Sequence, residues 1–296
     1  MSVVEKAAAL KERPAEAPAN DACGRPHSFS LDHARLAELG MYRPDAASSQ
    51  LALELRAVKR RLLRRLGYLR ASGERQAYRM PGRQRNLILV TSTRASEGKT
   101  FSAANLALSL AFEDQIETLL IDADIPRPKV RSRFSLPSGP GLTDKLVNPA
   151  MNLHAMQHRV VGAPLTILPE GARIDRVSEL FAGEECQRLL TALSTEIPDR
   201  LVIIDAPPVL ATTEAVILAK YVDEIIFVVE ANATPEPAVA SAIDELLDVN
   251  PNVSLMLNRC LFGSGGSHYG SYDYYGPGDT ADEPSGAKAE GASHGT

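Results

Sequence analysis

From residue 86 onward, short aliphatic runs alternate with amphipathic segments, and this pattern constrains the fold more than any other feature of the chain. Runs of this kind suit strands of a parallel sheet that are buried on both faces. The expected strands are 86–91, 118–122, 165–169, 201–206, 224–230 and 253–258. The segments between them read as helices that cover the sheet. The pattern therefore predicts an α/β fold with a doubly wound, mainly parallel sheet.

The composition divides the 296 residues into four predicted parts. Residues 1–28 are rich in Ala, Pro, Glu and Lys without hydrophobic periodicity, which predicts a disordered segment. Residues 29–85 are expected to form a helical basic segment, and residues 86–261 the nucleotide-binding domain. Residues 262–296 are rich in Gly and Tyr with few aliphatic residues, which predicts a flexible tail.

The helical segment carries eleven Lys or Arg against two Glu between residues 51 and 85. Three interpretations stay open for it, namely a solvated helix face, docking to a partner subunit, and contact with acidic lipid. Few aromatic residues interleave the basic ones and the net charge is -5, so no nucleic-acid partner is expected.

The cysteines and the apolar runs bear on the cellular compartment. Cys23, Cys186 and Cys260 are scattered without metal-ligand spacing, which is typical of reduced thiols in a cytoplasmic protein. No apolar run approaches the roughly 20 residues that cross a bilayer. We therefore expect a cytoplasmic protein whose contact with a membrane would depend on a partner.

The first expected strand runs into TSTRASEGKT, residues 91–100, and then into a helix. Strand, small-residue loop, Gly-Lys-Thr and helix form the context of a phosphate-binding loop, although Thr93 replaces its first glycine. We expect the backbone N–H groups to wrap the β-phosphate of ATP, Lys99 to reach the β- and γ-phosphates, and Thr100 to ligate Mg²⁺. The predicted nucleotide contacts in this stretch are Ala95, Ser96, Glu97, Gly98, Lys99, Thr100 and Phe101.

Carboxylates follow two of the expected strands. Asp122 and Asp124 stand at the end of the strand at 118–122, and Asp205 at the end of the strand at 201–206. Parallel strand ends open onto one edge, where ligands bind. We expect Asp205 to hold Mg²⁺ mainly through water, Asp124 to complete the metal shell, and Asp122 to accept a proton from an attacking hydroxyl. The predicted catalytic residues are Lys99, Asp122 and Asp124.

Three motifs, ASEGKT, LLIDAD and VIIDAPP, resemble the Walker A, Walker A′ and Walker B motifs of the bacterial tyrosine kinases. The resemblance covers about residues 30–276 and points to the branch associated with exosortase and exopolysaccharide loci, through segments such as RLAELGM, LPEG and PPVLATTEA. It implies a P-loop NTPase architecture, a protein-tyrosine kinase that uses ATP and Mg²⁺, and the roles given above for the loop and the aspartates. It also places Asn258, at the end of the last expected strand, against the adenine.

The resemblance further implies partners and a cellular role. The expected activator is a membrane-bound polysaccharide chain-length determinant protein, which would recruit the kinase to the inner membrane. A homo-oligomer that exchanges tails and a cognate tyrosine phosphatase are also implied. The process implied is control of exopolysaccharide biosynthesis or export.

The chain departs from the family pattern at several places. Ala95 and Ser96 replace Pro and Gly of the usual loop, so a demand for positive φ at Ser96 would cause strain. Pro126 stands where the family usually has Arg, and Arg127 follows one step later. The helix motif ExxRxxR, tied to ring assembly, is degraded to Leu53, Arg56 and Lys59.

Four of the eight tyrosines lie in the tail stretch SHYGSYDYYGPG, at residues 269, 272, 274 and 275. Tyr269, Tyr272, Tyr274 and Tyr275 are the predicted phosphoacceptors of an autokinase. A glycine-rich tether would let these tyrosines reach their own active site or that of a neighbouring subunit.

Other interpretations of the chain stay open. A low-complexity tail without a role is one alternative. Another is a partitioning or positioning ATPase, since Arg94 occupies the place of the signature lysine of that class. The last is a nucleotide-gated switch without kinase activity.

Overall fold

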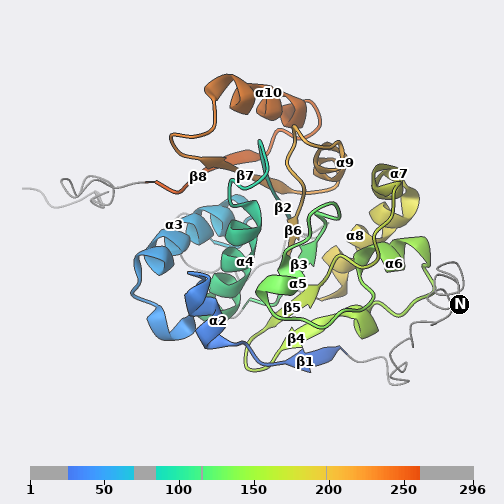
Figure 1. Cartoon of the computed structure of the whole chain (residues 1–296), viewed down its shortest axis with the longest axis horizontal. Coiled ribbons are helices and arrows are strands. Elements are labelled where there is room, and N and C mark those ends of the chain that lie inside the picture. The colour runs from blue at the N-terminus through green and yellow to red at the C-terminus, as the bar shows by residue number, and fades with distance from the viewer. Residues whose placement is uncertain (1–25, 70–84, 115, 198, 261–296) are drawn as a thin grey trace, which may run out of the picture. The chain divides into compact units, whose positions relative to one another are not determined.

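A computed structural model describes residues 26–69, 85–114, 116–197 and 199–260. Its centre is an eight-stranded sheet in the order β1-β4-β5-β3-β6-β2-β7-β8 (Figure 1). All neighbouring strands run parallel except β4 and β5, which are antiparallel. The strands are β1 (His27–Phe29), β2 (Leu87–Ser92), β3 (Thr118–Asp122), β4 (His158–Val160), β5 (Leu165–Leu168), β6 (Leu201–Asp205), β7 (Glu224–Glu230) and β8 (Val253–Asn258).

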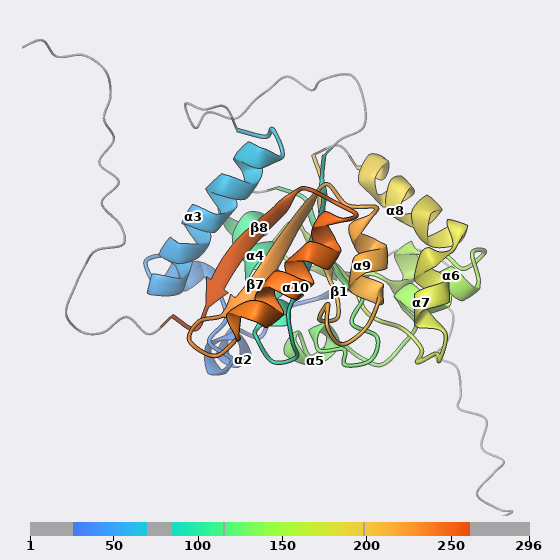
Figure 2. The same cartoon turned by 90° about the horizontal axis from the view of Figure 1, so that it is seen from above.

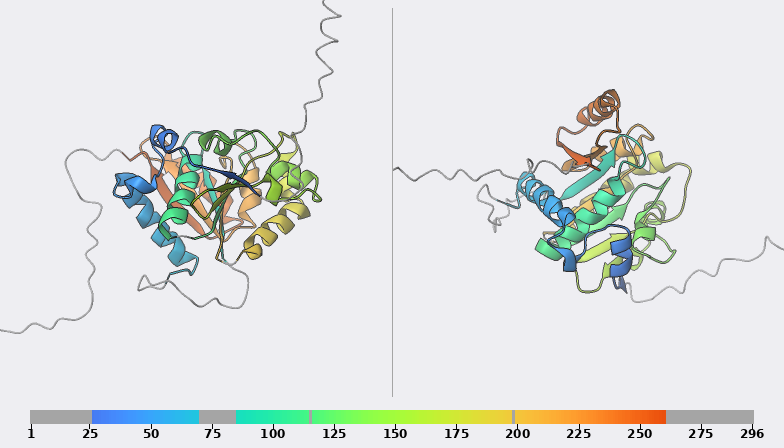
Figure 3. Two further views of the ribbon diagram at one scale, coloured as in Figure 1. Left: turned by 90° about the horizontal axis from the view of Figure 1, so that it is seen from below. Right: turned by 60° about the vertical axis from the view of Figure 1, so that its left-hand side comes forward.

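Helices cover both faces of the sheet, so the predicted fold class is confirmed. Ile88 and Val90 of β2 pack toward α3 and α4, while Leu87 and Leu89 face the layer that contains α6 to α10. Figures 2 and 3 show α3 and α8 on opposite sides of the sheet. The helices are α2 (His33–Glu38), α3 (Gln50–Arg65), α4 (Lys99–Ser109), α5 (Val130–Arg133), α6 (Leu142–Val147), α7 (Val177–Ala182), α8 (Glu184–Glu196), α9 (Glu214–Ala219) and α10 (Glu236–Leu247).

All six expected strands are present, but β1 and β4 were not predicted from the sequence. Each has only three residues and no continuous apolar run, so hydrophobic periodicity could not reveal either strand. The finding also corrects the end of the predicted disordered segment at 1–28, because His27 and Ser28 belong to β1 and pair with β4, whereas residues 1–25 lie outside the described residues. His27 and Ser28 are ordered by a partner strand far along the chain, not by their own composition.

The helical segment before β2 packs onto the helix that follows the phosphate-binding loop. α3 begins after Ser49, whose hydroxyl accepts a hydrogen bond from the N–H of Ala52, and it buries Leu55 and Leu62. The buried Tyr42 donates its backbone N–H to Asn105 Oδ1 of α4 at 2.5 Å. The segment therefore contacts α4, the helix that begins at Lys99 of the predicted phosphate-binding loop.

The basic face predicted for this segment lies on α3. Its exposed cations are Arg56, Arg60, Arg61, Arg64 and Arg65, of which Arg65 forms an ion pair with the buried Glu224 at 2.6 Å. Of the degraded ring motif, Leu53 is 49% exposed, whereas Lys59 is 2% exposed and therefore inaccessible to a second copy.

Some expectations fall outside the described residues, namely those for Cys23, for the part of the basic segment at 70–84, and for the tail at 262–296. Cys186 and Cys260 are free thiols. Over the part of the chain that the structure describes, no helix combines the length and apolar character of a membrane span.

Candidate nucleotide and phosphoryl-transfer site

The loop between β2 and α4 is shaped by the buried side chain of Glu97. Its carboxylate accepts hydrogen bonds from the backbone N–H of Arg94 at 2.9 Å and from Thr234 Oγ1 at 2.7 Å. Its backbone oxygen accepts another from Asn258 Nδ2 at 2.8 Å. The loop is therefore tied to the segments at the carboxyl ends of β7 and β8. Glu97 is a positioning residue, because its carboxylate is turned toward the protein.

Two loop residues have left-handed backbone conformations. Ser96 has a φ of 74°, so this position demands the positive φ that glycine adopts without cost. Gly98, the residue before α4, has a φ of 98°. A Cβ atom placed on Gly98 would lie 1.9 Å from Asn258 Nδ2. The loop therefore tolerates a side chain at Ser96 but not at Gly98.

A Gly98→Ala variant is expected to bind Mg-ATP about tenfold more weakly or worse, a loss of about 1.4 kcal/mol. The new methyl group would displace the Asn258 amide and break its hydrogen bond to the Glu97 backbone oxygen. Titration with a fluorescent ATP analogue measures the change. Gly67→Ala is the matched control, since Gly67 has a φ of 83° and a Cβ atom added there would have nothing within 4 Å. An equal loss of affinity in both variants would contradict the assignment.

The sequence-predicted carboxylates meet at one edge of the sheet. Asp122 and Asp205 are register partners at the ends of β3 and β6, and neither is exposed. Lys99 Nζ lies 2.5 Å from Asp124 Oδ2 and 3.7 Å from Asp205 Oδ1. The structure thus brings Lys99, Asp122, Asp124 and Asp205 together, as their positions at strand ends led us to expect.

Burial and mutual repulsion set the proton affinities in this cluster. Burial, and next the carboxylate of Asp205, raises the pKa of Asp122 well above its usual value. Burial also raises the pKa of Asp205, although Lys99 acts in the opposite direction. Burial alone would lower the pKa of Lys99, but Asp205 and Asp124 outweigh it and the pKa is raised. Lys99 is therefore charged at neutral pH.

The arrangement fits a magnesium ion held partly by substrate. Within the described ranges, no group of three His, Cys, Asp or Glu side chains is arranged to hold a metal. Both carboxylate oxygens of Asp205 are buried without a well-formed hydrogen bond among these residues, although Thr100 at the start of α4 is near enough to lower the pKa of Asp205. Mg²⁺ usually takes only one or two protein carboxylates, with water and phosphate oxygens as the other ligands. Asp205 and Thr100 are the residues that fit this role.

Asp124 and Asp122, the two other aspartates, already accept hydrogen bonds within the protein. Asp124 contacts Lys99 through Oδ2, and its Oδ1 accepts a hydrogen bond from the backbone N–H of Arg127 at 3.2 Å. Asp122 accepts hydrogen bonds from the backbone N–H groups of Asp124, Lys129 and Val130. Asp122 therefore also holds the start of α5 against the sheet, a structural task that its position at a strand end did not reveal.

Lys99 of this cluster also lines a cavity of about 500 Å³. Its lining includes six of the predicted nucleotide contacts, namely Ser96, Gly98, Lys99, Thr100, Phe101 and Asn258. Ala95 is exposed beside it, and the side chain of Glu97 is turned away. The lining residues that sequence reasoning missed are Leu39, Lys129, Arg133 and Arg259. No local motif distinguishes them, because they come from segments far from the loop.

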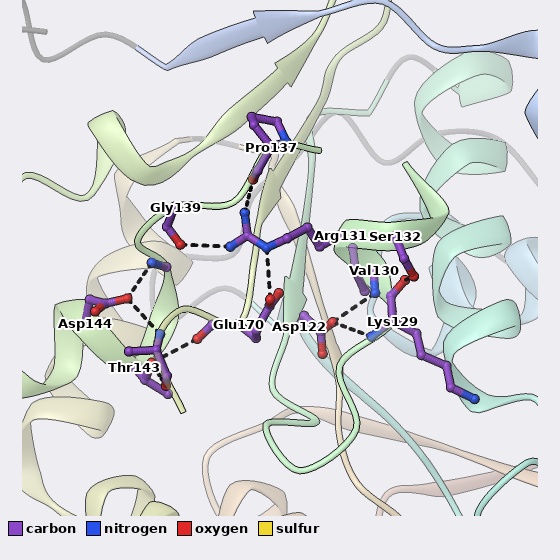
Figure 4. A network of polar contacts seen from close by, with 12 residues as sticks. Asp122, Lys129, Val130, Arg131, Ser132, Pro137, Gly139, Thr143, Asp144 and Glu170 are labelled. Carbon is purple, nitrogen blue, oxygen red and sulfur yellow. Dashed lines mark hydrogen bonds and ion pairs between the residues drawn. The ribbon is translucent and has the colours of Figure 1, made fainter. Parts of the chain in front are cut away.

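The segment around α5 is braced by Arg131. The Arg131 side chain donates hydrogen bonds to Glu170 Oε1 at 2.9 Å, to the backbone oxygen of Gly139 at 3.0 Å, and to that of Pro137. Figure 4 shows this network beside the contacts that Asp122 makes with the start of α5. Arg131 thus fixes α5 from one side while Asp122 fixes it from the other.

No protein-family model matches the sequence. Over 197 residues, or 67% of this chain, it is 31% identical to the tyrosine-protein kinase YwqD of Bacillus subtilis, and the match covers 80% of YwqD. The chain belongs to the bacterial tyrosine kinases. A second bacterial tyrosine kinase, ptk of Acinetobacter johnsonii, is 35% identical over 136 residues, which are 46% of this chain but only 18% of that longer relative.

Solved structures share the fold, among them the kinase domain of the Escherichia coli tyrosine kinase ETK, with a TM-score of 0.59 over 82% of this chain and 94% of its own, at 20% identity. The kinase domain of VpsO is 34% identical, with a TM-score of 0.55, over 60% of this chain and 86% of the VpsO domain. The chimerical protein CapA2B2 has a TM-score of 0.61 over 80% of this chain and 94% of its own, at 21% identity. The predicted P-loop NTPase architecture and the predicted enzyme class, a protein-tyrosine kinase, are both confirmed.

Proposed function

We propose that this bacterial tyrosine kinase transfers the γ-phosphoryl group of ATP to tyrosines of its own tail. The acceptors are Tyr269, Tyr272, Tyr274 and Tyr275, which lie outside the described residues. The observation that carries the proposal is the buried cluster of Lys99 and three aspartates. Lys99 also lines the cavity formed in part by the predicted phosphate-binding loop. Phosphoryl transfer depends mainly on positioning and electrostatic stabilisation, which this arrangement supplies.

Each group of the cluster has a task in the proposed reaction. Lys99 exchanges its contact with Asp124 for oxygens of the β- and γ-phosphates, and the loop N–H groups bind the same phosphates. Asp205 and Thr100 would hold Mg²⁺, and the bound ion would supply charge neutralisation for the phosphates. Asp124, once released by Lys99, would be the third residue of the metal site.

The transfer forms a bond between the tyrosine oxygen and Pγ and breaks the bond from Pγ to the bridging oxygen, so that ADP leaves with the electron pair. Asp122 accepts the phenolic proton. Its raised pKa supports this task, because a carboxylate with an ordinary pKa is a weaker base. Its hydrogen bonds to backbone N–H groups must loosen before the proton can arrive.

The setting follows from the family. We infer that the kinase acts in the cytoplasm and is recruited to the inner membrane by a membrane-bound polysaccharide chain-length protein that activates it. Copies of the kinase exchange tails, a tyrosine phosphatase reverses the modification, and the cycle controls exopolysaccharide synthesis or export. Support for these partners is the resemblance to bacterial tyrosine kinases.

Replacing all four tail tyrosines with Phe tests the acceptor assignment. The variant is expected to bind Mg-ATP like the wild type but to lose about 90% or more of the phosphotyrosine signal, because the catalytic cluster is intact and the acceptors are gone. Immunoblotting after incubation with Mg-ATP measures it, with Tyr221→Phe as the control outside the tail. Undiminished phosphotyrosine would contradict the assignment. ATP hydrolysis stimulated by DNA or lipid, without phosphotyrosine in the wild type, would favour the positioning ATPase.

A further inference from the structure

The nucleotide cavity carries an excess of positive charge that the Gly-Lys-Thr motif does not explain. Four of its lining residues are cations, namely Lys99, Lys129, Arg133 and Arg259, and none is Asp or Glu. Two of them have carboxylate partners, since Lys99 contacts Asp124 and Arg259 contacts Glu230 at 2.7 Å. Lys129 and Arg133 both come from the segment of α5. A cavity lined in this way favours a polyanion.

The surroundings of Arg133 fit a side chain that binds a ligand. Its guanidinium carbon lies 5.9 Å from the centroid of the Phe101 ring. Its Nε is buried and has no hydrogen-bond partner among the described residues. Burial lowers the pKa of Arg133, and the carboxylate of Asp205 opposes that change, so the guanidinium lies within the field of the predicted metal ligand. A buried donor without a partner is costly unless a ligand satisfies it.

Arg131, in the same helix, differs from Arg133 because its side chain has hydrogen-bond partners within the protein. Both arginines belong to α5, but Arg131 is tied to Glu170 and to two backbone oxygens in the network of Figure 4. That network fixes the helix without the help of Arg133. In the same view the Lys129 side chain extends away from the Asp122 carboxylate that its backbone N–H contacts. The side chains of Lys129 and Arg133, the other two cations of this segment, therefore line the cavity without being needed to brace α5.

We propose that Arg133 contacts the phosphate chain of the bound nucleotide as a second cation beside Lys99. A guanidinium offers several donors in one plane and binds phosphate oxygens through paired hydrogen bonds. The Phe101 ring lines the same cavity and lies within cation–π range of the guanidinium. The inference rests on the proposed function only in that it takes ATP as the nucleotide.

Inorganic tripolyphosphate tests the proposal, because it has the phosphates of ATP without the adenosine. Competition against a fluorescent ATP analogue is measured for the wild type, Arg133→Ala, Arg133→Lys and Arg159→Ala. Arg159 is an exposed arginine of β4 and serves as the control for charge alone. We expect Arg133→Ala to bind tripolyphosphate and ATP about 10- to 100-fold more weakly, Arg133→Lys to recover part of the loss, and Arg159→Ala to match the wild type.

The competition measurements distinguish the proposed role of Arg133 from the proposed kinase reaction. Wild-type affinity for tripolyphosphate in Arg133→Ala would overturn the role of Arg133 and leave the proposed kinase reaction untouched. An equal loss in Arg133→Ala and Arg133→Lys, together with a lowered melting temperature in both, would assign Arg133 to packing against Phe101 and overturn the proposal. A wild type that binds neither ATP nor tripolyphosphate would overturn both this inference and the proposed function.

Discussion

An Asp205→Asn variant is expected to lose tyrosine phosphorylation by about 100-fold or more, yet to unfold at a higher temperature than the wild type in the absence of nucleotide. The loss of activity follows from the loss of the carboxylate that fits Mg²⁺ best in this site. The gain in stability follows from its environment, since Asp205 is not exposed and the effect of its burial on the pKa outweighs the opposite effects of Lys99 and Thr100. A phosphotyrosine immunoblot and a thermal melt measure the two effects.

The sign of the stability change can be derived from the pKa. Burial raises the pKa of Asp205, so folding favours its neutral form, and the ionised carboxylate destabilises the fold as pH rises above the usual pKa of an aspartate. The neutral amide removes this penalty, and we expect a gain of about 1 kcal/mol at neutral pH that shrinks as pH falls. A variant less stable than the wild type would mean that the attraction of Lys99 at 3.7 Å dominates instead.

A Lys99→Met variant is expected to lose phosphorylation by about 1000-fold and, unlike Asp205→Asn, to lose about 3 kcal/mol of unfolding free energy without ligand. Lys99 is the cation that Asp124 and Asp205 share, and its attraction also reaches Asp122. Methionine leaves these buried carboxylates to repel one another. Chemical denaturation measures the loss, and the stabilisation by added Mg²⁺ should exceed that of the wild type because the metal replaces the missing charge.

The double variant Lys99→Met, Asp205→Asn provides the control. The two changes touch the same cluster, so their effects on stability should not be additive, and the double variant should be more stable than Lys99→Met alone. It should remain inactive. Strict additivity would show that the cluster is not a unit and would contradict the electrostatic assignment.

The strands and the acidic residues at their ends were predictable from the sequence because their signals are local. Each of the main strands is an aliphatic run, and Asp122 and Asp205 directly end two of them. A parallel sheet brings such strand ends to one edge whatever the strand order. The cluster of Lys99 with the aspartates could therefore be expected from the order of residues along the chain.

The remaining features depend on contacts between distant segments, which no local pattern encodes. The Glu97 carboxylate is held by Thr234, and its backbone oxygen by Asn258. The packing of the N-terminal segment depends on Asn105 meeting Tyr42. β1 exists because β4 lies beside it. Arg133 is one of several arginines in its stretch, and only the fold shows that it lines the cavity while Arg131 braces the helix.

Mass spectrometry of the purified protein before and after incubation with Mg-ATP tests the central claim most directly. The peptide that contains residues 269–275 is compared between the wild type, Lys99→Met and Asp205→Asn. We predict phosphate on these tyrosines in the wild type, increasing with time, and none in either variant. Phosphate at the same level in both variants would show that another enzyme modifies the tail. A wild-type tail that stays unmodified, with bound ATP and an activating partner present, would contradict the autokinase.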